Sequence, residues 1–172
     1  MLPAHTFSCK SKMLLLKCNN GNNGNRRTFT MGELCKTSYH TADGNIPSRV
    51  AIENLTRICD GWLEDLRFSY NQLYGDEGHE ISIIINSGFR SEEVNWMCGG
   101  VKGSNHLTGC AVDIKCYGPE QMIRMAGILL DIADGIRRDF DELILEKRGS
   151  TCWIHFAVRP KNNRRKILFD CR

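Results

Sequence analysis

The chain has 172 residues, of which 41% are hydrophobic and 25% are charged. This length is enough for one domain with a substantial core, and the composition is that of a globular protein rather than a disordered or fibrous one. The 23 Lys and Arg residues and 20 Asp and Glu residues leave a net charge of +3, which is too balanced to predict nucleic-acid binding. No apolar run approaches the roughly 20 residues of a membrane span. We therefore expect a monomer with no nucleic-acid partner and no membrane span.

Nine cysteines occur in the chain, an odd number, and no two of them are spaced as C-x-x-C. This pattern favours free thiols in a reducing compartment over a disulfide framework. The early apolar run "MLLL" is shorter than the core of a secretory signal. We expect synthesis in the cytoplasm without a recognisable signal peptide, so a substrate outside the cell would require release or export by another route.

In chain order, residues 1–28 are rich in Asn and Gly and predict a loosely ordered leader, followed by a single domain over residues 29–172. Apolar residues at helical spacing predict a long amphipathic helix over residues 47–75. The run "EISIIINSG", residues 80–88, is typical of a strand buried on both faces. A short helix capped by Ser91 is expected next.

The segment "CAVDIKC", residues 110–116, predicts a strand in which Asp113 points away from the apolar side. A second helix follows within residues 117–140, and "DELILE" and "CWIHFAV" then predict a hairpin. This order of elements indicates an α+β fold with a mostly antiparallel sheet and flanking helices. The basic run "RPKNNRRK", residues 159–166, is interpreted as a solvated turn.

Candidate chemistry centres on His106, Asp113 and His155, which stand in separate predicted elements. Two imidazoles and one carboxylate form a ligand set for zinc that leaves one position open, as catalysis requires. Spacing alone leaves a second interpretation open, in which the three are ordinary hydrogen-bonded residues of a turn and two strands.

Four segments together carry a resemblance: "SGFRSEEVN", "GGVKGSNHLTGCAVDI", "FDELILE" and "WIHFAV". In this order they resemble the signature of the zinc D-alanyl-D-alanine carboxypeptidases, the peptidase M15 family of bacterial cell-wall enzymes and phage lysins. The central pattern is Ser-x-His-x-x-Gly-x-Ala-x-Asp, which starts at Ser104 and ends at Asp113. The resemblance covers about residues 29–158.

The resemblance implies that His106, Asp113 and His155 bind one Zn²⁺ ion per chain. It also implies a hedgehog/DD-peptidase-like sheet with the zinc in a cleft on it. The implied activity is hydrolysis of an amide bond next to a D-amino acid in peptidoglycan stem peptides, by a D-Ala-D-Ala carboxypeptidase or by an endopeptidase or lysin. The alternative is a binding module on the same scaffold that holds zinc with little or no catalysis.

The substrate side of the site is expected to include Arg90, Ser104 and Trp153, with Arg90 also taking part in catalysis. A guanidinium suits a substrate carboxylate or the oxyanion of a tetrahedral intermediate.

The general base is the point at which this sequence departs from several branches of the family, because Cys152 stands where those branches carry an acid. Strand alternation turns Cys152 away from His155. An even hairpin loop would place Glu146 opposite Thr151 and Glu142 opposite His155, with both carboxylates on the ligand face; an odd loop or a bulge would reverse this. Other branches keep a glutamate in a similar "FDxLIxE" strand, so Glu146 is the preferred base and general acid, and Glu142 is the second choice.

Overall fold

The structure is a computed structural model that describes residues 28–135 and 137–171. The predicted leader lies outside these ranges apart from Thr28. The described residues form an α+β fold around one five-stranded sheet in the order β1-β2-β4-β3-β5. The strands are β1 (Ile85–Ser87), β2 (Ala111–Cys116), β3 (Glu142–Arg148), β4 (Thr151–Ala157) and β5 (Lys166–Cys171). The assignment of residues 29–172 to a single domain stays a prediction.

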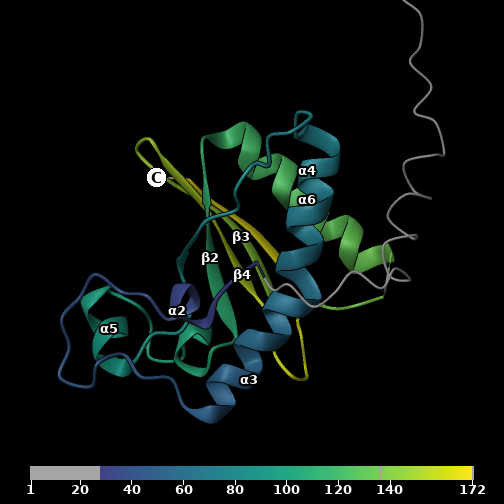
Figure 1. Cartoon of the computed structure of the whole chain (residues 1–172). Coiled ribbons are helices and arrows are strands. Elements are labelled where there is room, and N and C mark those ends of the chain that lie inside the picture. The colour runs from purple at the N-terminus through teal and green to yellow at the C-terminus, as the bar shows by residue number, and fades with distance from the viewer. Residues whose placement is uncertain (1–27, 136, 172) are drawn as a thin grey trace, which may run out of the picture.

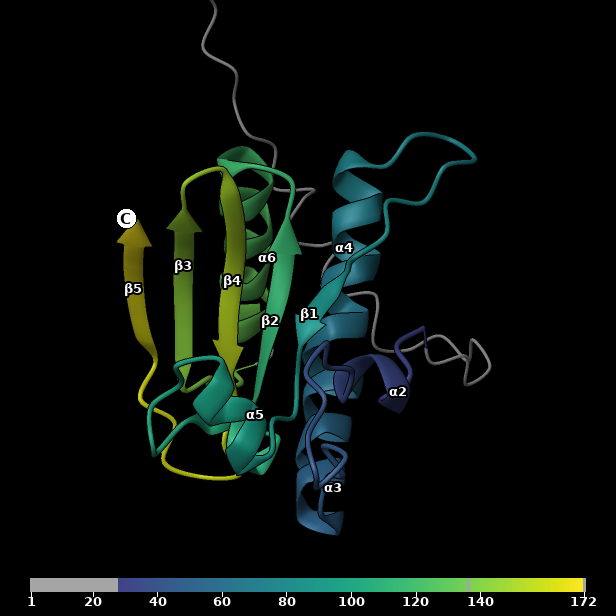
Figure 2. The same ribbon diagram turned by 90° about the vertical axis from the view of Figure 1, so that its left-hand side faces the viewer.

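The sheet is mixed, so the prediction of a mostly antiparallel sheet is wrong. Strand β5 pairs in parallel with β3, whereas the other neighbours are antiparallel. Strands β3 and β4 form a hairpin, so β4 ends at the end of the sheet where β3 begins. The connection after β4 passes this end and joins the free edge of β3, and β5 therefore runs in the same direction as β3 (Figure 2).

The long predicted helix is present, but it is interrupted by one wider turn. It consists of α3 (Arg49–Ile58), the π-helical segment η1 (Cys59–Leu63) and α4 (Glu64–Tyr74). The Ser48 hydroxyl caps its start by accepting a hydrogen bond from the Ala51 backbone. Most of the predicted apolar stripe is buried, but Leu73 in the last turn is exposed. The carbonyl of Gly61, within the π segment, accepts a hydrogen bond from Arg138.

The long helices cover one face of the sheet. Helix α6 (Pro119–Gly135) packs on β2, β3 and β4 and against α4, as Figure 1 shows. The core between these layers includes a contact of Trp62 with Phe156, whose ring centroids lie 5.0 Å apart. Val112, Ile114 and Ile154 also point into this core and are fully buried. Asp113 and His155, between them in the alternation, lie on the opposite face.

Strand β1 is shorter than predicted and lies at an edge of the sheet. It has three residues and pairs only with β2, with a register shift between Ile85 and Ser87. Ile81 and Ile83, before it, still pack against the core. The prediction of a strand over residues 80–88 buried on both faces is therefore wrong, because core packing produces the same apolar run without a partner strand on each side.

Three short helices surround one end of the strands. They are α2 (Met31–Leu34), α5 (Glu92–Met97) and the 3₁₀ turn η2 (Asn105–Thr108). The predicted cap of α5 is confirmed, since the Ser91 hydroxyl accepts a hydrogen bond from the Val94 backbone at 3.3 Å. In Figure 2 α5 lies in front of the sheet face that α6 leaves uncovered. Within the described residues, no helix has the length and apolar character needed to cross a membrane.

Candidate metal centre

His106 is positioned by a short turn with a defined start and end. The Ser104 hydroxyl accepts a hydrogen bond from the His106 backbone at 3.3 Å and caps η2. Gly109 ends η2 with φ of 68°, and a Cβ there would lie 2.4 Å from the carbonyl oxygen of Ala51. Only glycine fits both the left-handed conformation and this close approach. The Ser-x-His-x-x-Gly part of the motif is thus a structural requirement of the turn that carries His106.

Asp113 and His155 are brought together by strand pairing. Asp113 on β2 lies directly opposite His155 on β4. Both side chains point to the sheet face that is not covered by α6, and η2 adds His106 from the end of the same face. The predicted orientation of Asp113, away from the apolar side, is confirmed.

Three donor atoms converge on one point. The His155 Nδ1 lies 3.0 Å from Asp113 Oδ1, the His106 Nε2 lies 3.2 Å from the same oxygen, and the two nitrogens are 3.2 Å apart. Ligands about 2.0–2.1 Å from a tetrahedral zinc ion lie roughly 3.3–3.4 Å from one another. These three residues, of which His106 and Asp113 are buried, form a cluster able to hold a metal ion.

In both rings, the nitrogen that points away from the cluster has a polar partner. That partner decides which of the two nitrogens carries the proton and which has a free lone pair. His106 Nδ1 donates to the carbonyl of Gly88 at 2.6 Å, which leaves the lone pair on Nε2. A side chain at Gly88 would meet the Leu34 carbonyl, so glycine is needed to bring this backbone close. His155 Nε2 faces Glu142 Oε2 at 3.6 Å, which favours the proton on that nitrogen and the lone pair on Nδ1.

Arg90 holds the second carboxylate oxygen of Asp113. Its Nη2 donates to Asp113 Oδ2, and its Nε donates to the Ser87 hydroxyl at 2.8 Å. Burial opposes ionisation of Asp113, but interactions with His106 and His155 outweigh it and lower the pKa of this carboxyl. Arg90 thus lies beside the cluster and contacts one of its members directly, and its role in substrate binding stays a prediction.

Glu146 lies on the same face, opposite Trp153 in the β3–β4 pairing. The predicted pairing with Thr151 is wrong by two residues, because the hairpin turn is tighter than assumed and Arg148 pairs with Thr151. A register shift of two residues leaves Glu146 on the predicted face of the sheet. Burial and the nearby Asp113 charge raise the pKa of Glu146. Its closest cation is Arg148, whose Nη2 lies 3.6 Å from Oε2.

Glu142, the second candidate base, lies opposite Ala157 rather than His155 and has a different environment. Its interactions with His155, Arg164 and Lys166 outweigh burial and lower its pKa to about 2. Arg164 Nη2 lies 2.9 Å from its Oε1 and Asn105 Nδ2 donates to Oε2 at 3.1 Å. A carboxylate this acidic orients His155 better than it accepts a proton near neutral pH.

The basic run 159–166 contributes to this network, which the sequence did not reveal. Arg164 donates to both oxygens of the fully buried Asp141, at 2.8 and 2.7 Å. Arg159 Nε lies 3.0 Å from Asp141 Oδ2 and donates to Asn105 Oδ1. Residues 159–165 form a largely exposed turn before β5, as interpreted, but these two arginines also bind a buried carboxylate. The only sequence signal for Asp141 was the "FD" that begins the segment "FDELILE", just before β3.

Cys152 does not belong to the metal cluster. It is buried on the helix-covered face, opposite Cys116 on β2. This position agrees with the prediction that alternation turns the thiol away from His155.

Comparison with known proteins identifies the family of the chain. The family model described as Peptidase M15 matches residues 27–133, which is more than half of the chain. The match includes Arg90, His106 and Asp113 and ends before His155, which β4 brings to the other two residues of the cluster. No curated protein matches the chain. The matched region and the cluster that it helps to build lead to one conclusion: the chain belongs to the peptidase M15 family.

Proposed function

We propose that the protein is a zinc-dependent peptidase that hydrolyses an amide bond next to a D-amino acid in peptidoglycan stem peptides. The bond is the terminal D-Ala-D-Ala bond or an internal one, cut by carboxypeptidase or endopeptidase action. The observation that carries the proposal is the convergence of His106, Asp113 and His155 in a member of a peptidase family. Two nitrogens and one oxygen at this spacing suit zinc.

The three residues would hold one ion and leave a fourth coordination position for the reaction. A zinc ion bound there supplies Lewis-acid activation of water and of the scissile carbonyl. His106 and His155 are presented with the correct nitrogens by Gly88 and Glu142, so the protein does not have to reorganise these rings when the ion binds.

Glu146 is proposed as the general base and acid. Water adds to the carbonyl carbon and gives a proton to the Glu146 carboxylate; the C–N bond then breaks and the same proton passes to the leaving amine. The raised pKa of Glu146 favours both transfers near neutral pH. Trp153 lies opposite it, and its interaction with the carboxylate opposes part of this rise in pKa.

Arg90 is proposed to position Asp113 and to bind a substrate oxygen. Two of its nitrogens are engaged by Asp113 and Ser87. Among the described residues no partner occupies Nη1, which can therefore donate to the carbonyl oxygen as it gains charge. Ser104 caps η2, so its contribution to substrate binding is proposed to be indirect, through the position of His106.

The proposed site of action is cell-wall peptidoglycan, reached after release or export. Digestion of purified peptidoglycan, followed by mass spectrometry of the fragments, tests both the activity and the bond. Protein purified without chelator or nickel should contain one zinc per chain and release new fragments, whereas the Glu146→Gln protein should contain the same zinc and release far fewer. Zinc-loaded protein that leaves every peptidoglycan unchanged would instead establish the alternative, a zinc-holding binding module.

A further inference from the structure

The sheet face that carries the metal cluster continues toward the β3–β4 hairpin, and a lysine lies on this extension. Lys115 follows Asp113 by two residues in β2 and lies directly opposite Trp153 in β4. Residues two apart on a strand point to the same face and lie about 6.5–7 Å apart. The Lys115 backbone donates to the Ile84 carbonyl at 2.9 Å, so this part of β2 is held from the β1 side as well.

The charge of Lys115 is not neutralised by the fold. Asp113 and Glu146 share its face, but Asp113 pairs with Arg90 and Glu146 with Arg148. In the part of the chain that the structure describes, no carboxylate forms an ion pair with Lys115. By contrast, Arg148 pairs with Asp170 at 2.9 Å. Lys115 is thus a half-buried cation on the site face that is free to bind an anion from outside.

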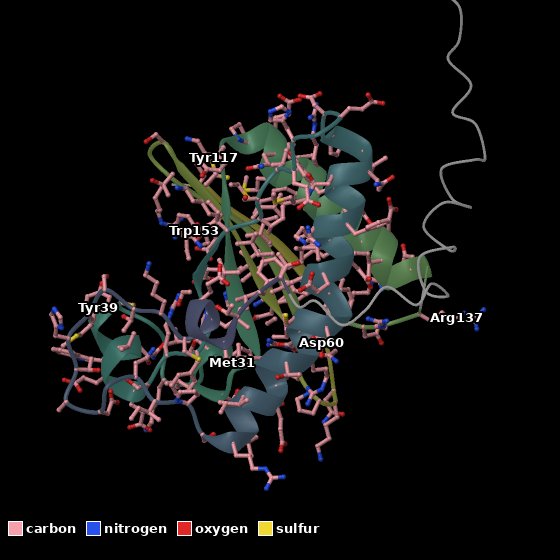
Figure 3. All side chains as sticks on the ribbon, viewed as in Figure 1. Met31, Tyr39, Asp60, Tyr117, Arg137 and Trp153 are labelled. Carbon is pink, nitrogen blue, oxygen red and sulfur yellow. The ribbon has the colours of Figure 1, made fainter. Side chains whose placement is uncertain are left out.

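One aromatic ring contacts this lysine, and a second belongs to the residue opposite it in the sheet. The Lys115 Nζ lies 4.8 Å from the ring centroid of Tyr117, which is 65% exposed. Trp153, half-buried, carries the Arg148 guanidinium over its ring at 5.6 Å. Figure 3 shows Tyr117 and Trp153 on the side of β2 away from α4 and α6. Rings beside a cation exclude part of the water that would otherwise screen it, which strengthens its attraction for an anion.

We propose that Lys115 is a specificity-determining residue that binds a carboxylate of the substrate, one or two residues from the bond that is cut. This inference rests on the proposed peptidase function. An extended peptide advances about 3.3–3.6 Å per residue, so the separation of Lys115 from Asp113 corresponds to about two residues of substrate. The carboxylate has two sources in a stem peptide: the free C-terminus of the main chain, or the side chain of an acidic residue.

The test compares Lys115→Met with wild type on three matched synthetic stem peptides. One peptide keeps both carboxylates, one has an amidated C-terminus, and one has a side-chain amide in place of the side-chain carboxylate. For wild type, kcat/KM should fall about tenfold to hundredfold when the carboxylate that Lys115 binds becomes an amide. Lys115→Met should show the same loss on the unmodified peptide and no further loss on that amide.

Lys147→Met is the matched control. It removes the same charge from the same end of the sheet, but Lys147 alternates with Glu146 and points to the opposite face. The Lys147→Met protein should prefer the carboxylate peptide over the amide peptide as strongly as wild type does. Zinc content should be unchanged in both variants, which separates loss of substrate recognition from loss of the metal.

The inference would be overturned if, for each of the two carboxylates, replacement by an amide lowered kcat/KM equally in wild type and in Lys115→Met. If wild type hydrolyses none of the peptides, the proposed function fails, and calorimetric binding of the same three peptides to the zinc-loaded proteins decides about Lys115. A preference for carboxylate over amide in wild type that Lys115→Met lacks supports the inference. Equal binding of the three peptides, or no binding, overturns it.

Discussion

At the scale of single residues, the two histidines offer different nitrogens to the cluster. His106 presents Nε2 from a turn, and His155 presents Nδ1 from a strand. Each choice follows from the partner of the other nitrogen, Gly88 or Glu142. The geometry of the cluster therefore depends on neighbours that do not belong to it.

Zinc affinity should rise with pH. In the metal-free protein, burial opposes the charged form of His155, but Asp113 and Glu142 outweigh it and raise its pKa to about 9. Zinc requires the unprotonated Nδ1, so binding below about pH 9 must release this proton, and apparent affinity should increase about tenfold per pH unit up to that pH. Calorimetric titration in buffers of different ionisation enthalpy measures the proton released. An affinity that stays constant between pH 6 and 8 would contradict the assignment.

Substitution of the histidines provides a second check on the ligand set. His106→Ala and His155→Ala should each lose zinc, because two ligands hold the ion far more weakly than three. His40→Ala and His79→Ala are the controls and should retain zinc at full occupancy, since neither residue belongs to the cluster. Metal content is measured by elemental analysis.

Glu146→Gln should lower kcat by about two or more powers of ten. The amide keeps the size of the side chain but cannot accept and return the proton, and Glu146 is not a metal ligand, so fold and zinc content should not change. Cys152→Ala is the control, and it should retain near-wild-type kcat because the thiol points into the core. The opposite pair of results would identify the thiol as the catalytic group.

Arg90→Lys should lower both activity and zinc affinity by about tenfold to hundredfold. A lysine keeps the charge but cannot donate to Asp113 and Ser87 in the geometry of the guanidinium. Steady-state rates and competitive zinc titration measure the two effects. Wild-type values for both would mean that neither the positioning of Asp113 nor the substrate contact matters.

At the scale of elements, η2 controls where His106 lies. Gly109→Ala should destabilise the protein by at least about 2 kcal/mol, because the left-handed conformation alone costs about 1–2 kcal/mol and the added Cβ meets the Ala51 carbonyl. Zinc affinity should fall as well, since η2 must move.

Gly103→Ala is a matched control in the same loop, because an added Cβ at Gly103 meets nothing within 4 Å. Its unfolding temperature and its zinc affinity, measured by thermal unfolding and zinc titration, should be close to those of wild type. A Gly109→Ala protein as stable as Gly103→Ala would show that η2 adapts without cost.

At the scale of the whole molecule, Asp141 joins segments far apart in the sequence. It is fully buried and accepts hydrogen bonds from Arg164, after β4, and from Asn105, beside His106. Burial opposes its ionisation, but these partners outweigh burial and lower the pKa of the carboxyl. The connection between β4 and β5 is thereby linked to the turn that carries His106.

Asp141→Asn should lower the free energy of unfolding of the metal-free protein by about 1–3 kcal/mol at pH 7. Because the pKa is lowered on folding, the ionised group stabilises the protein above its ordinary pKa of about 3.9 and loses this contribution as the pH falls below it. The difference from wild type should therefore shrink in acid. Asp139→Asn is the control, since that side chain is 66% exposed and lies 3.7 Å from Arg165. Denaturant unfolding at several pH values measures both, and a difference that does not shrink in acid would contradict this account.

The sequence by itself predicted the family, the two helical regions, the hairpin and the three residues that meet in the cluster. Helical spacing is local, and the Ser-x-His-x-x-Gly-x-Ala-x-Asp pattern combines a turn that needs glycine with a strand that alternates. The face of Glu146 was also predicted correctly, although its partner was not, because a register error of two residues preserves the side of the sheet.

Tertiary structure alone decided which strands lie at the edges, that β5 runs parallel to β3, and what surrounds the metal cluster. Each depends on contacts between segments distant in sequence, which leave no local period. The pKa values of Glu142 and Glu146 move in opposite directions because His155, Arg164 and Lys166 interact with the first carboxylate, while burial and the charge of Asp113 act on the second. Two glutamates in one strand therefore differ in chemistry only because of what the folded chain places beside them.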